Sequence, residues 1–587
     1  MIRWDIEQYS AEQYRQAWEL SKKLNMSEIL TMQLVRHGIT TESNAKLFFR
    51  PQLPDLINPF RMKDMDIAVD RLNDAIGRKE HIMVYGDYDV DGVTAVTLVY
   101  KFLLQYYSNL EYYIPNRYDE GYGVSKKGID YAKQRGVTLI IILDCGIKAH
   151  EEIAYARSLG IDFIICDHHF PDTDENGNDI LPPAIAILNP KQQADTYPFK
   201  HLCGCGIGFK FMQGFAKNNG IPFSRLIPLL DLCVISIASD LVNITDENRI
   251  LAYHGLKQLN LKPSTGIQAI IETCGLSEQE ISMNDIIFKI GPRINASGRM
   301  ENGQLAVNLL VERNLEKALE LAKEIDEYND QRREADKQMT EEANELVHAL
   351  LDKEDSKLWA SETPLSIVVY DETWKKGILG IVATRLAEDY FRPTIVFTRE
   401  GDYAVGSARS VAGFDIYAAI RSCRELLVNF GGHTYACGLT IRWSDVERFK
   451  TNFEKYVAGH ISPTQTEPAI KIDAVIDFAD INRRLLHDLK RFSPFGPGNM
   501  KPHFMTKEVY DFGTSKVVGR TQKHVKMELV DSKSPTVVNG IAFGQAPLVK
   551  QIKSKQAFDI AYTIEENQYK KGFVQLQIDD IHFHTEG

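Results

Sequence analysis

Residues 81–92 read His81-Ile-Met-Val-Tyr-Gly-Asp-Tyr-Asp-Val-Asp-Gly92, a short apolar run followed by three aspartates. The same order returns twice: Thr138-Leu-Ile-Ile-Ile-Leu143 precedes Asp144, and Ile161-Asp-Phe-Ile-Ile-Cys166 precedes Asp167-His168-His169. Apolar runs of this length are typical of strands buried in a parallel sheet. Because α/β sheets bind their ligands beyond the carboxyl ends of their strands, the pattern predicts a polar site along one sheet edge.

The segment from about residue 65 to 255 alternates apolar runs with amphipathic stretches. Such alternation predicts right-handed crossovers and a mostly parallel sheet. The expected strands lie near 81–86, 111–115, 138–143, 161–166 and 184–188. The expected helices lie at about 92–106, 125–135, 148–159 and 205–219.

The rest of the chain predicts further domains. Residues 1–60 look helical and polar, and 313–353 form one charged stretch without Gly or Pro. As a helix, that stretch would be about 60 Å long. A second strand–helix region runs from 364 to about 460. Six short strands then predict a small β-barrel of the OB class, near 503–511, 515–519, 524–530, 537–543, 557–564 and 572–583.

These patterns together predict an α/β multidomain fold. The expected division is an N-terminal helical segment (1–60), a parallel-sheet domain (61–312), a connecting helix (313–353), a second α/β domain (354–462) and an OB-like barrel (463–587).

Composition limits the class of protein. No stretch approaches the ~18 continuous apolar residues of a membrane span, and eight scattered cysteines indicate a reducing, cytoplasmic compartment. Cys203-Gly-Cys205 is spaced wrongly for zinc and predicts a glycine-rich turn before a helix. The net charge is −12, yet residues 481–587 hold 16 Lys/Arg against 11 Asp/Glu. A basic tail on an acidic body fits polyanion binding, and ordinary scatter explains it equally well.

Asp87, Asp89 and Asp91 cannot all lie in a strand core, because buried unpaired carboxylates are too costly. Alternate residues leaving a strand point to one side, so at least two of them can meet at one ion. Carboxylates suit Mg²⁺ or Mn²⁺, and imidazole shifts the preference toward Mn²⁺. An isolated Asp-x-Asp is more often a turn or a helix cap, but Asp144 and Asp167-His168-His169 at matching strand ends strengthen the metal hypothesis.

A fourth segment, Ile235-Ser-Ile-Ala-Ser-Asp240, is again an apolar run that ends in aspartate, with a helix cap as the alternative. The four segments offer enough ligands for two metals with one bridging carboxylate. Two ions roughly 3.5–4 Å apart are the arrangement that hydrolyses phosphate esters.

These motifs resemble the DHH phosphoesterase superfamily, and within it the RecJ family of exonucleases that degrade single-stranded DNA 5′→3′. The superfamily motifs are Tyr85–Gly92, Leu143–Gly146 and Asp167–His169. Residues 113–123, 291–299, 406–410, 431–433 and 494–499 narrow the resemblance to the RecJ family, and it extends from about residue 60 to the barrel. It implies two Mn²⁺ or Mg²⁺ ions, release of 5′-mononucleotides, and a role in recombination and repair.

The resemblance also implies a role for each residue of the cluster. One ion would take Asp89 and Asp144 with Asp87 near, and the other would take Asp91, Asp144, His168 and Asp240. Asp144 would bridge the two ions. His169 would face the scissile phosphate or its attacking water, and Asp167 would orient the imidazoles.

Further residues are predicted to hold the nucleic acid. Arg117 lies in a loop rich in Tyr and Gly, where arginine would grip phosphate and tyrosine would stack on bases; a plain surface turn is the alternative. Arg293 and Arg299 flank an expected turn of small residues. Ser407 and Arg409 form a small pocket that suits a terminal 5′-phosphate. Gly431, Gly432 and His433 resemble the signature of the DHH-associated domain, although alone they are more often a plain loop.

The barrel is expected to hold the strand upstream of the cut through Arg483, Arg484, Lys490, Arg491, Lys501, Arg520, Lys523 and Lys526. Lys375 replaces a histidine, and Ser239 an alanine, that are common in RecJ-like chains.

Two other functions fit parts of the sequence. One is a smaller-substrate DHH hydrolase acting on short oligoribonucleotides or cyclic dinucleotides, but such chains are usually shorter and lack the barrel. The other is a non-catalytic DNA-binding relative, which would have lost the metal carboxylates that this chain retains. The resemblance favours the exonuclease. It also implies a monomer that does not associate with membranes and that has a single-strand binding protein and a helicase as partners.

Overall fold

The computed structural model describes residues 2–300, 303–351, 364–567 and 570–584. The chain forms two compact units. One consists mainly of Glu324–Ala469, and the other mainly of Trp4–Gly298 and Ile470–Gly587. Within the described residues, no helix has both the length and the apolar character that a membrane span requires.

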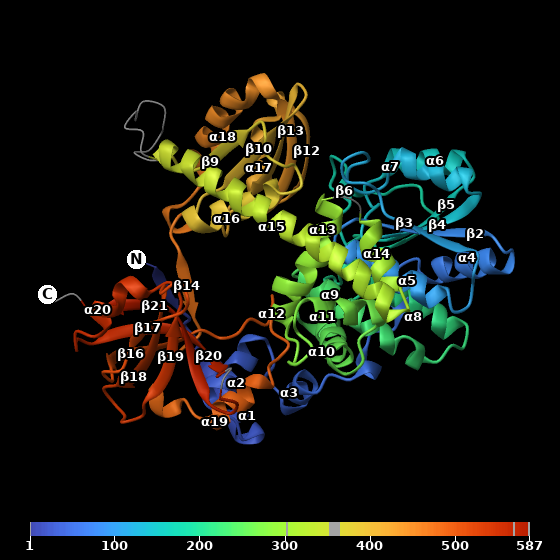
Figure 1. The fold of residues 1–587 in the computed structure, drawn as a ribbon. Helices are drawn as coiled ribbons and strands as arrows, with labels where there is room; N and C mark the ends of the chain where they lie inside the picture. The colour runs from blue at the N-terminus through green and yellow to red at the C-terminus, as the bar shows by residue number, and fades with distance from the viewer. Residues whose placement is uncertain (1, 301–302, 352–363, 568–569, 585–587) are drawn as a thin grey trace. The chain divides into compact units, whose positions relative to one another are not determined.

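A five-stranded parallel sheet in the larger unit has the order β3-β2-β4-β5-β8. All five strands occur where the sequence predicted them: β2 (His81–Gly86), β3 (Leu110–Tyr113), β4 (Val137–Leu143), β5 (Asp162–Cys166) and β8 (Ala186–Leu188). The middle strands are almost fully buried, because helices cover both faces (Figure 1). One face packs on α6 (Lys126–Gln134) and α7 (His150–Ser158), and the other on α4 (Met65–Gly77), α5 (Val90–Leu103) and α8 (Gly204–Asn218).

Helices α9 (Leu230–Ser239) and α10 (Asp246–Leu261) extend this domain, and α9 packs against α5. The apolar run before Asp240 is therefore the end of a helix that is buried all round. Further helices are α11 (Thr265–Thr273), α12 (Met283–Asp285) and α14 (Gln304–Val311).

The small-residue segment after Gly291 is helix α13 (Gly291–Met300), so the predicted turn between Arg293 and Arg299 is wrong. A Cβ on Gly298 would lie 2.6 Å from the Tyr88 carbonyl oxygen, so only glycine allows this approach. Asn295 Oδ1 also accepts a hydrogen bond from Val90 N at 3.1 Å. The small residues thus let a helix pack on the aspartate loop, which stabilises the helical conformation.

A β-barrel forms the C-terminal part of the larger unit, as the sequence predicted. Its strands run in the order β16-β20-β21-β19-β18, and pairing of β18 with β16 closes the ring. The six predicted strands are β16 (Phe504–Asp511), β17 (Lys516–Val518), β18 (His524–Asp531), β19 (Val538–Ala542), β20 (Phe558–Glu566) and β21 (Val574–Phe583). Three short strands near the barrel were not predicted: β15 (Ala474–Val475), beside β16, and β14 (Ala469–Ile472) with its partner β1 (Arg3–Ile6).

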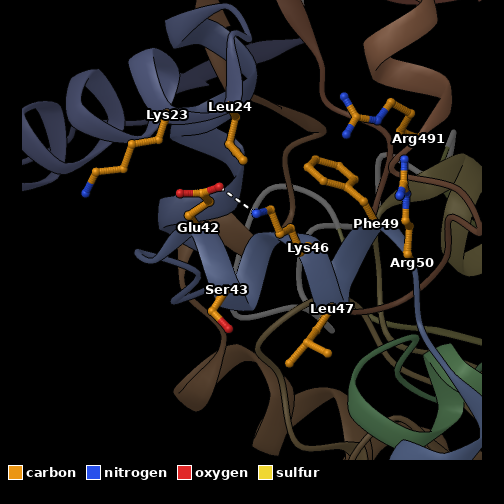
Figure 2. A pocket seen from close by; sticks show the side chains of 9 residues that line it. All are labelled: Lys23, Leu24, Glu42, Ser43, Lys46, Leu47, Phe49, Arg50 and Arg491. Atoms are coloured by element: carbon orange, nitrogen blue, oxygen red, sulfur yellow. Dashed lines mark ion pairs between the residues drawn. The ribbon is translucent and has the colours of Figure 1, made fainter.

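The N-terminal segment shares its core with the barrel. Helices α1 (Ala11–Leu24), α2 (Glu28–Arg36) and α3 (Glu42–Phe49) bury apolar side chains against α19 (Arg483–Lys490) and the barrel strands. A pocket of about 490 Å³ lies where these segments meet. Its lining includes Lys23, Lys46, Arg50 and Arg491, with Glu42 paired to Lys46 (Figure 2). The sequence did not predict that these segments, more than 400 residues apart, form one core.

The smaller unit contains most of the long helix α15 (Leu315–Leu351) and a second sheet of order β12-β13-β11-β10-β9. Strands β9 (Ile367–Asp371) and β10 (Thr394–Glu400) are parallel, and β11 (Tyr403–Arg409), β13 (Ala436–Arg442) and β12 (Leu427–His433) continue antiparallel. The helices are α16 (Leu379–Tyr390), α17 (Ile416–Ser422) and α18 (Val446–His460). The boundary predicted between 353 and 354 lies outside the described residues.

Candidate metal centre

Acidic residues converge at the carboxyl edge of the parallel sheet. Asp87 follows β2, Asp144 follows β4 and Asp167 follows β5. Asp89 caps α5, since its side chain accepts a hydrogen bond from Gly92 N at 3.1 Å. The strand pattern therefore places these side chains as the sequence predicted.

Asp91 and Asp240 reach the same place from helices. Asp91 lies in the first turn of α5, because the Asp89 cap starts that helix at Val90, about two residues earlier than the predicted start near residue 92. Asp240 follows the last residue of α9.

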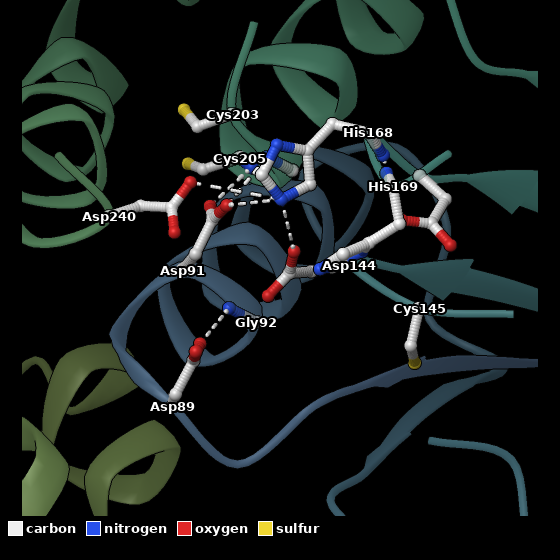
Figure 3. Close-up of polar contacts among 12 residues, drawn as sticks. Asp89, Asp91, Gly92, Asp144, Cys145, His168, His169, Cys203, Cys205 and Asp240 are labelled. Atoms are coloured by element: carbon white, nitrogen blue, oxygen red, sulfur yellow. Dashed lines mark hydrogen bonds and ion pairs between the residues drawn. The ribbon is translucent and has the colours of Figure 1, made fainter. Parts of the chain in front are cut away.

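The carboxylates and imidazoles form three overlapping groups in which the ligand atoms lie within 4.8 Å of one another. His168 Nε2 lies 3.1 Å from Asp144 Oδ1, and 3.7 Å from an oxygen of Asp91 and of Asp240 (Figure 3). The groups are Asp87, Asp89 and Asp144; Asp91, His168 and Asp240; and Asp144, His168 and His169. The structure thus brings all six predicted metal ligands into one cluster.

The electrostatics of the cluster suit a bound cation. Burial, and then the neighbouring carboxylates, raise the pKa of Asp87, Asp144 and Asp240. Within the described residues, the buried Oδ1 atoms of Asp87 and Asp144 accept no hydrogen bond. Crowded, unsatisfied carboxylates are the donor set that a divalent ion neutralises, so the residues fit Mn²⁺ or Mg²⁺.

Asp91 is fixed by contacts that the sequence did not predict. Its carboxylate accepts hydrogen bonds from Gly204 N at 2.6 Å, Cys205 N at 2.7 Å and Ser236 Oγ at 2.7 Å. The two N–H groups belong to the N-terminus of α8, where the helix dipole favours a negative charge. The Cys203-Gly-Cys205 segment, predicted as a turn before a helix, is itself the cap and first residues of α8, and it also orients a predicted ligand.

Asp167 orients the histidines and does not belong to any of the three groups. It accepts hydrogen bonds from Ile147 N at 3.0 Å and from His169 Nδ1 at 2.8 Å. Burial alone would raise the pKa of Asp167, but the His169 ring holds it below its usual range. Despite its own burial, His169 has its pKa raised to about 9 by Asp167, whereas burial lowers the pKa of His168 to about 4. These opposite shifts favour a neutral His168 imidazole, the form that can coordinate a metal, and a protonated His169 imidazole.

Lys191 lies beside the cluster and was not predicted. It follows β8, and its ammonium lies 4.9 Å from the Phe170 ring centroid. Its charge acts on Asp240 and Asp167. Since β8 ends at the same sheet edge as β2, β4 and β5, the strand pattern could have revealed this lysine.

Arg117 also reaches the cluster. Its guanidinium lies 5.1 Å from the Tyr88 ring, and its charge acts on Asp87. Tyr122 of the same loop donates a hydrogen bond to the Asp144 carbonyl at 3.4 Å and meets the His169 ring edge-on. The loop after β3 therefore brings one cation and one aromatic ring to the carboxylates.

Three family models match the chain in order. They are the N-terminal domain of the DHH family (81–237), the DHHA1 domain (364–459) and the RecJ OB domain (472–580). Over 583 residues the chain is 34% identical to the single-stranded-DNA-specific exonuclease RecJ of Bacillus subtilis, covering 99% of this chain and 70% of that protein. The chain belongs to the RecJ family. RecJ of Haemophilus influenzae is 31% identical, over 90% of this chain and 92% of its own length.

Solved structures of the RecJ family share this fold. RecJ from Thermus thermophilus in complex with Mn²⁺ matches with a TM-score of 0.82 at 22% identity, over all of this chain and 80% of that one. An exonuclease RecJ bound to manganese matches with a TM-score of 0.58 at 26% identity, over 70% of this chain and 98% of that one.

In this RecJ-family chain, the residues predicted in the DHHA1 segment gather at one sheet end. Arg409 Nη1 donates to Ser407 Oγ at 3.0 Å and to the Ala408 carbonyl at 2.8 Å. Strand β13 lies between β11 and β12, and its residue Ala436 is the strand partner of both Arg409 in β11 and His433 in β12. Gly431-Gly432-His433 is therefore the end of strand β12 and not a plain loop, with Gly432 at φ +147°.

The predicted cations of the RecJ OB segment divide into two sets. Lys490, Lys501 and Arg491 form ion pairs with Glu566, Glu565 and Asp488, Arg484 donates to the Asn25 carbonyl, and Arg483 stacks over Phe573. Arg520, Lys523 and Lys526 are exposed near the β17–β18 hairpin and form no ion pair within the described residues. Lys375 is exposed as well, and Ser239 Oγ is buried without a hydrogen-bond partner among the described residues.

Proposed function

We propose that this chain is a metal-dependent exonuclease specific for single-stranded DNA, which degrades the strand 5′→3′ and releases 5′-mononucleotides in recombination and repair. The observation that carries the proposal is the buried cluster of Asp87, Asp89, Asp91, Asp144, His168 and Asp240 in a RecJ-family chain. A RecJ relative with manganese bound supports the choice of metal.

The cluster would hold two ions, with Asp144 shared between them. When bound, Mn²⁺ or Mg²⁺ would stabilise charge on the scissile phosphate and lower the pKa of a water molecule. His168 supplies a neutral imidazole nitrogen, and α8 holds Asp91 in its ligand geometry. The protonated His169 ring, held by Asp167, can donate a hydrogen bond to a phosphate oxygen.

Several groups would contact the strand. Arg117 and Lys191 supply cations beside the carboxylates, and Tyr122 supplies an aromatic ring. Ser407, Arg409 and His433 would take the terminal 5′-phosphate, with Gly431 and Gly432 allowing its approach. Arg293 and Arg299 on α13 would contact the backbone, and Arg520, Lys523 and Lys526 the strand upstream of the cut.

The predicted domain division, from the helical segment 1–60 to the barrel 463–587, is part of the proposal. So are a monomeric state, a cytoplasmic location, and partnership with a single-strand binding protein and a helicase.

One assay tests the proposed function. Single strands carrying a label at the 5′ or the 3′ end are incubated with full-length protein and Mn²⁺, with EDTA as the control. The expected result is early release of the 5′ label as a mononucleotide, only with metal. Early release of the 3′ label would contradict the polarity. Faster hydrolysis of a cyclic dinucleotide or a short oligoribonucleotide would identify a smaller-substrate hydrolase.

A further inference from the structure

The loop between Asp240 and α10 is held by the segment that leads into the barrel. Ile244 N donates a hydrogen bond of 2.7 Å to the Pro497 carbonyl. That carbonyl belongs to the turn Ser493–Asn499, in which Gly496 and Asn499 exchange backbone hydrogen bonds. The barrel segment therefore makes a direct backbone contact four residues after Asp240.

The turn Ser493–Asn499 also packs closely against the loop that follows Asp240. A Cβ on Gly496 would lie 2.7 Å from Ile244 Cγ1, which is closer than real contacts of this kind. A Cβ on Gly498, whose φ is +74°, would lie 3.1 Å from Thr245 Cγ2. Asn499 Nδ2 closes the turn by donating 2.8 Å hydrogen bonds to the carbonyls of Phe492, just before the turn, and Pro494, within it. A Cβ at either glycine therefore presses on the side chain of Ile244 or Thr245, in the loop that follows Asp240.

Arg249 of α10 clamps the same turn. Its guanidinium is buried and stacks 3.7 Å from the Phe48 ring. It donates to the carbonyls of Phe48 at 2.9 Å, Phe492 at 3.0 Å and Ser493 at 3.1 Å. Among the described residues, Arg249 forms no ion pair with a carboxylate. Backbone carbonyls therefore offset the cost of burying its charge.

A second connection runs from α10 to the other side of the cluster. Asn248 Nδ2 donates to the Asn243 carbonyl at 2.9 Å and to the His201 carbonyl at 2.6 Å. His201 lies just before the N-terminus of α8, which holds Asp91. The loop after Asp240 and the segment before α8 are therefore fixed by one side chain.

We propose that the turn Ser493–Asn499 and Arg249 are positioning elements that hold Asp240 within reach of the metal, so that tight metal binding by the parallel-sheet domain depends on the barrel segment. This inference rests on the proposed role of Asp240 as a ligand. If the contacts served domain packing alone, loosening them would lower stability and leave metal affinity unchanged.

The test uses two glycine variants of the full-length protein. Gly496→Ala places its methyl group against Ile244. Gly540→Ala, inside the barrel, is a matched control, because its Cβ would also lie 2.7 Å from an isoleucine side chain, that of Ile578. Mn²⁺ affinity is measured without DNA, from the electron paramagnetic resonance signal of free Mn²⁺, and thermal unfolding is followed in parallel.

We expect Gly496→Ala to weaken Mn²⁺ binding at one site by about 10-fold, the usual effect of losing a group that orients a ligand, and Gly540→Ala to bind as the wild type does. Arg249→Lys, which retains the charge but loses the planar fork, should weaken the same site and provides a second variant if Gly496→Ala does not fold. Asp240→Asn separates the two hypotheses. If Asp240→Asn binds Mn²⁺ normally, the proposed ligand set is wrong. If Asp240→Asn weakens binding but folded Gly496→Ala and Arg249→Lys do not, only the positioning inference is overturned.

Discussion

The adjacent histidines His168 and His169 differ in their chemistry, because their surroundings differ. His168 is buried among carboxylates that point at its Nε2, whereas His169 has Asp167 at its Nδ1. Burial and the neighbouring His169 lower the pKa of His168 to about 4, although the carboxylates oppose this shift, whereas Asp167 raises the pKa of His169 to about 9. One imidazole can therefore coordinate a metal while the next offers a proton.

Asp144→Asn is expected to lower turnover of single-stranded DNA by at least about 100-fold, because Asp144 belongs to two of the three ligand groups. The variant should fold, since asparagine has the same shape and burial raises the pKa of Asp144 toward a neutral form in any case. Single-turnover kinetics with Mn²⁺ and a circular dichroism spectrum check both points. Normal turnover by a folded variant would exclude Asp144 as a bridging ligand.

Asp167→Asn is expected to reduce turnover by about 10–100-fold, the range found when a residue that orients a ligand is lost. The variant loses the charge that pairs with His169 but keeps a side chain of the same shape. Asp130→Asn is the matched control, because the Asp130 carboxylate accepts a hydrogen bond from the Tyr155 hydroxyl in an exposed position. Equal activity of the two variants would show that Asp167 has no orienting role.

Lys191→Met is expected to lower turnover by about 10-fold or more, since it removes a cation placed beside the site of charge development. Lys191→Arg should restore most of the loss. If Lys191→Arg turns over as slowly as Lys191→Met, and the KM for single-stranded DNA is unchanged in both variants, Lys191 only supports the fold around Phe170.

Single elements of the barrel also carry strain. Strand β21 has a bulge opposite Ala561 and Tyr562, which leaves Asp579 as the extra residue. Asp579 Oδ2 is buried and accepts no hydrogen bond within the described residues. Burial, and then Glu565 and Asp580, raise the pKa of Asp579 to about 6.

Asp579→Asn is therefore expected to stabilise the protein at pH 8. The folded protein retains a proton that the unfolded chain releases between pH 4 and about 6, so the wild type loses stability as pH rises through this window. After allowance for partial solvent exposure, the gain should be about 1–2 kcal/mol at pH 8 and close to zero at pH 4. Urea unfolding at both pH values measures it, and an equal gain at both would contradict the titration argument.

At the scale of the whole molecule, charge is unevenly distributed along the chain. The chain carries −12 overall, and its deepest concentration of carboxylates is the metal cluster. Residues 481–587 have a surplus of five cations, of which Lys490 and Lys501 are already paired with glutamates. Arg520, Lys523 and Lys526, which are exposed near the β17–β18 hairpin and form no ion pair within the described residues, are the candidates for contact with phosphates.

Replacing Arg520, Lys523 and Lys526 by Ala should weaken binding of a single strand and reduce the slope of log K against log salt by about 2, at ~0.7 per lost phosphate contact. Replacing Lys490, Lys501 and Lys533, which are ion-paired, is the control of equal charge. Fluorescence anisotropy with EDTA present measures binding without cleavage. Equal slopes for the two triple variants would exclude the hairpin as a phosphate contact.

Sequence alone determined the parallel sheet, the barrel strands and the six candidate ligands. The reason is local: apolar runs fix the strands, and polar residues that follow parallel strands must meet at one edge. The turn predicted between Arg293 and Arg299 is wrong, because the small residues there serve contact with Tyr88 and Val90, about 200 positions away.

Only the tertiary structure decided what holds the ligands in place. Three contacts depend on groups that folding brings together. They are the α8 amides on Asp91, the buried Asp167–His169 pair, and the turn that supports the Asp240 loop. Hydrogen bonds and burial of this kind have no periodic signature in a sequence, because they depend on distance in space and not on spacing along the chain. The sequence therefore determined which residues are candidate metal ligands, and the fold determined their burial and orientation.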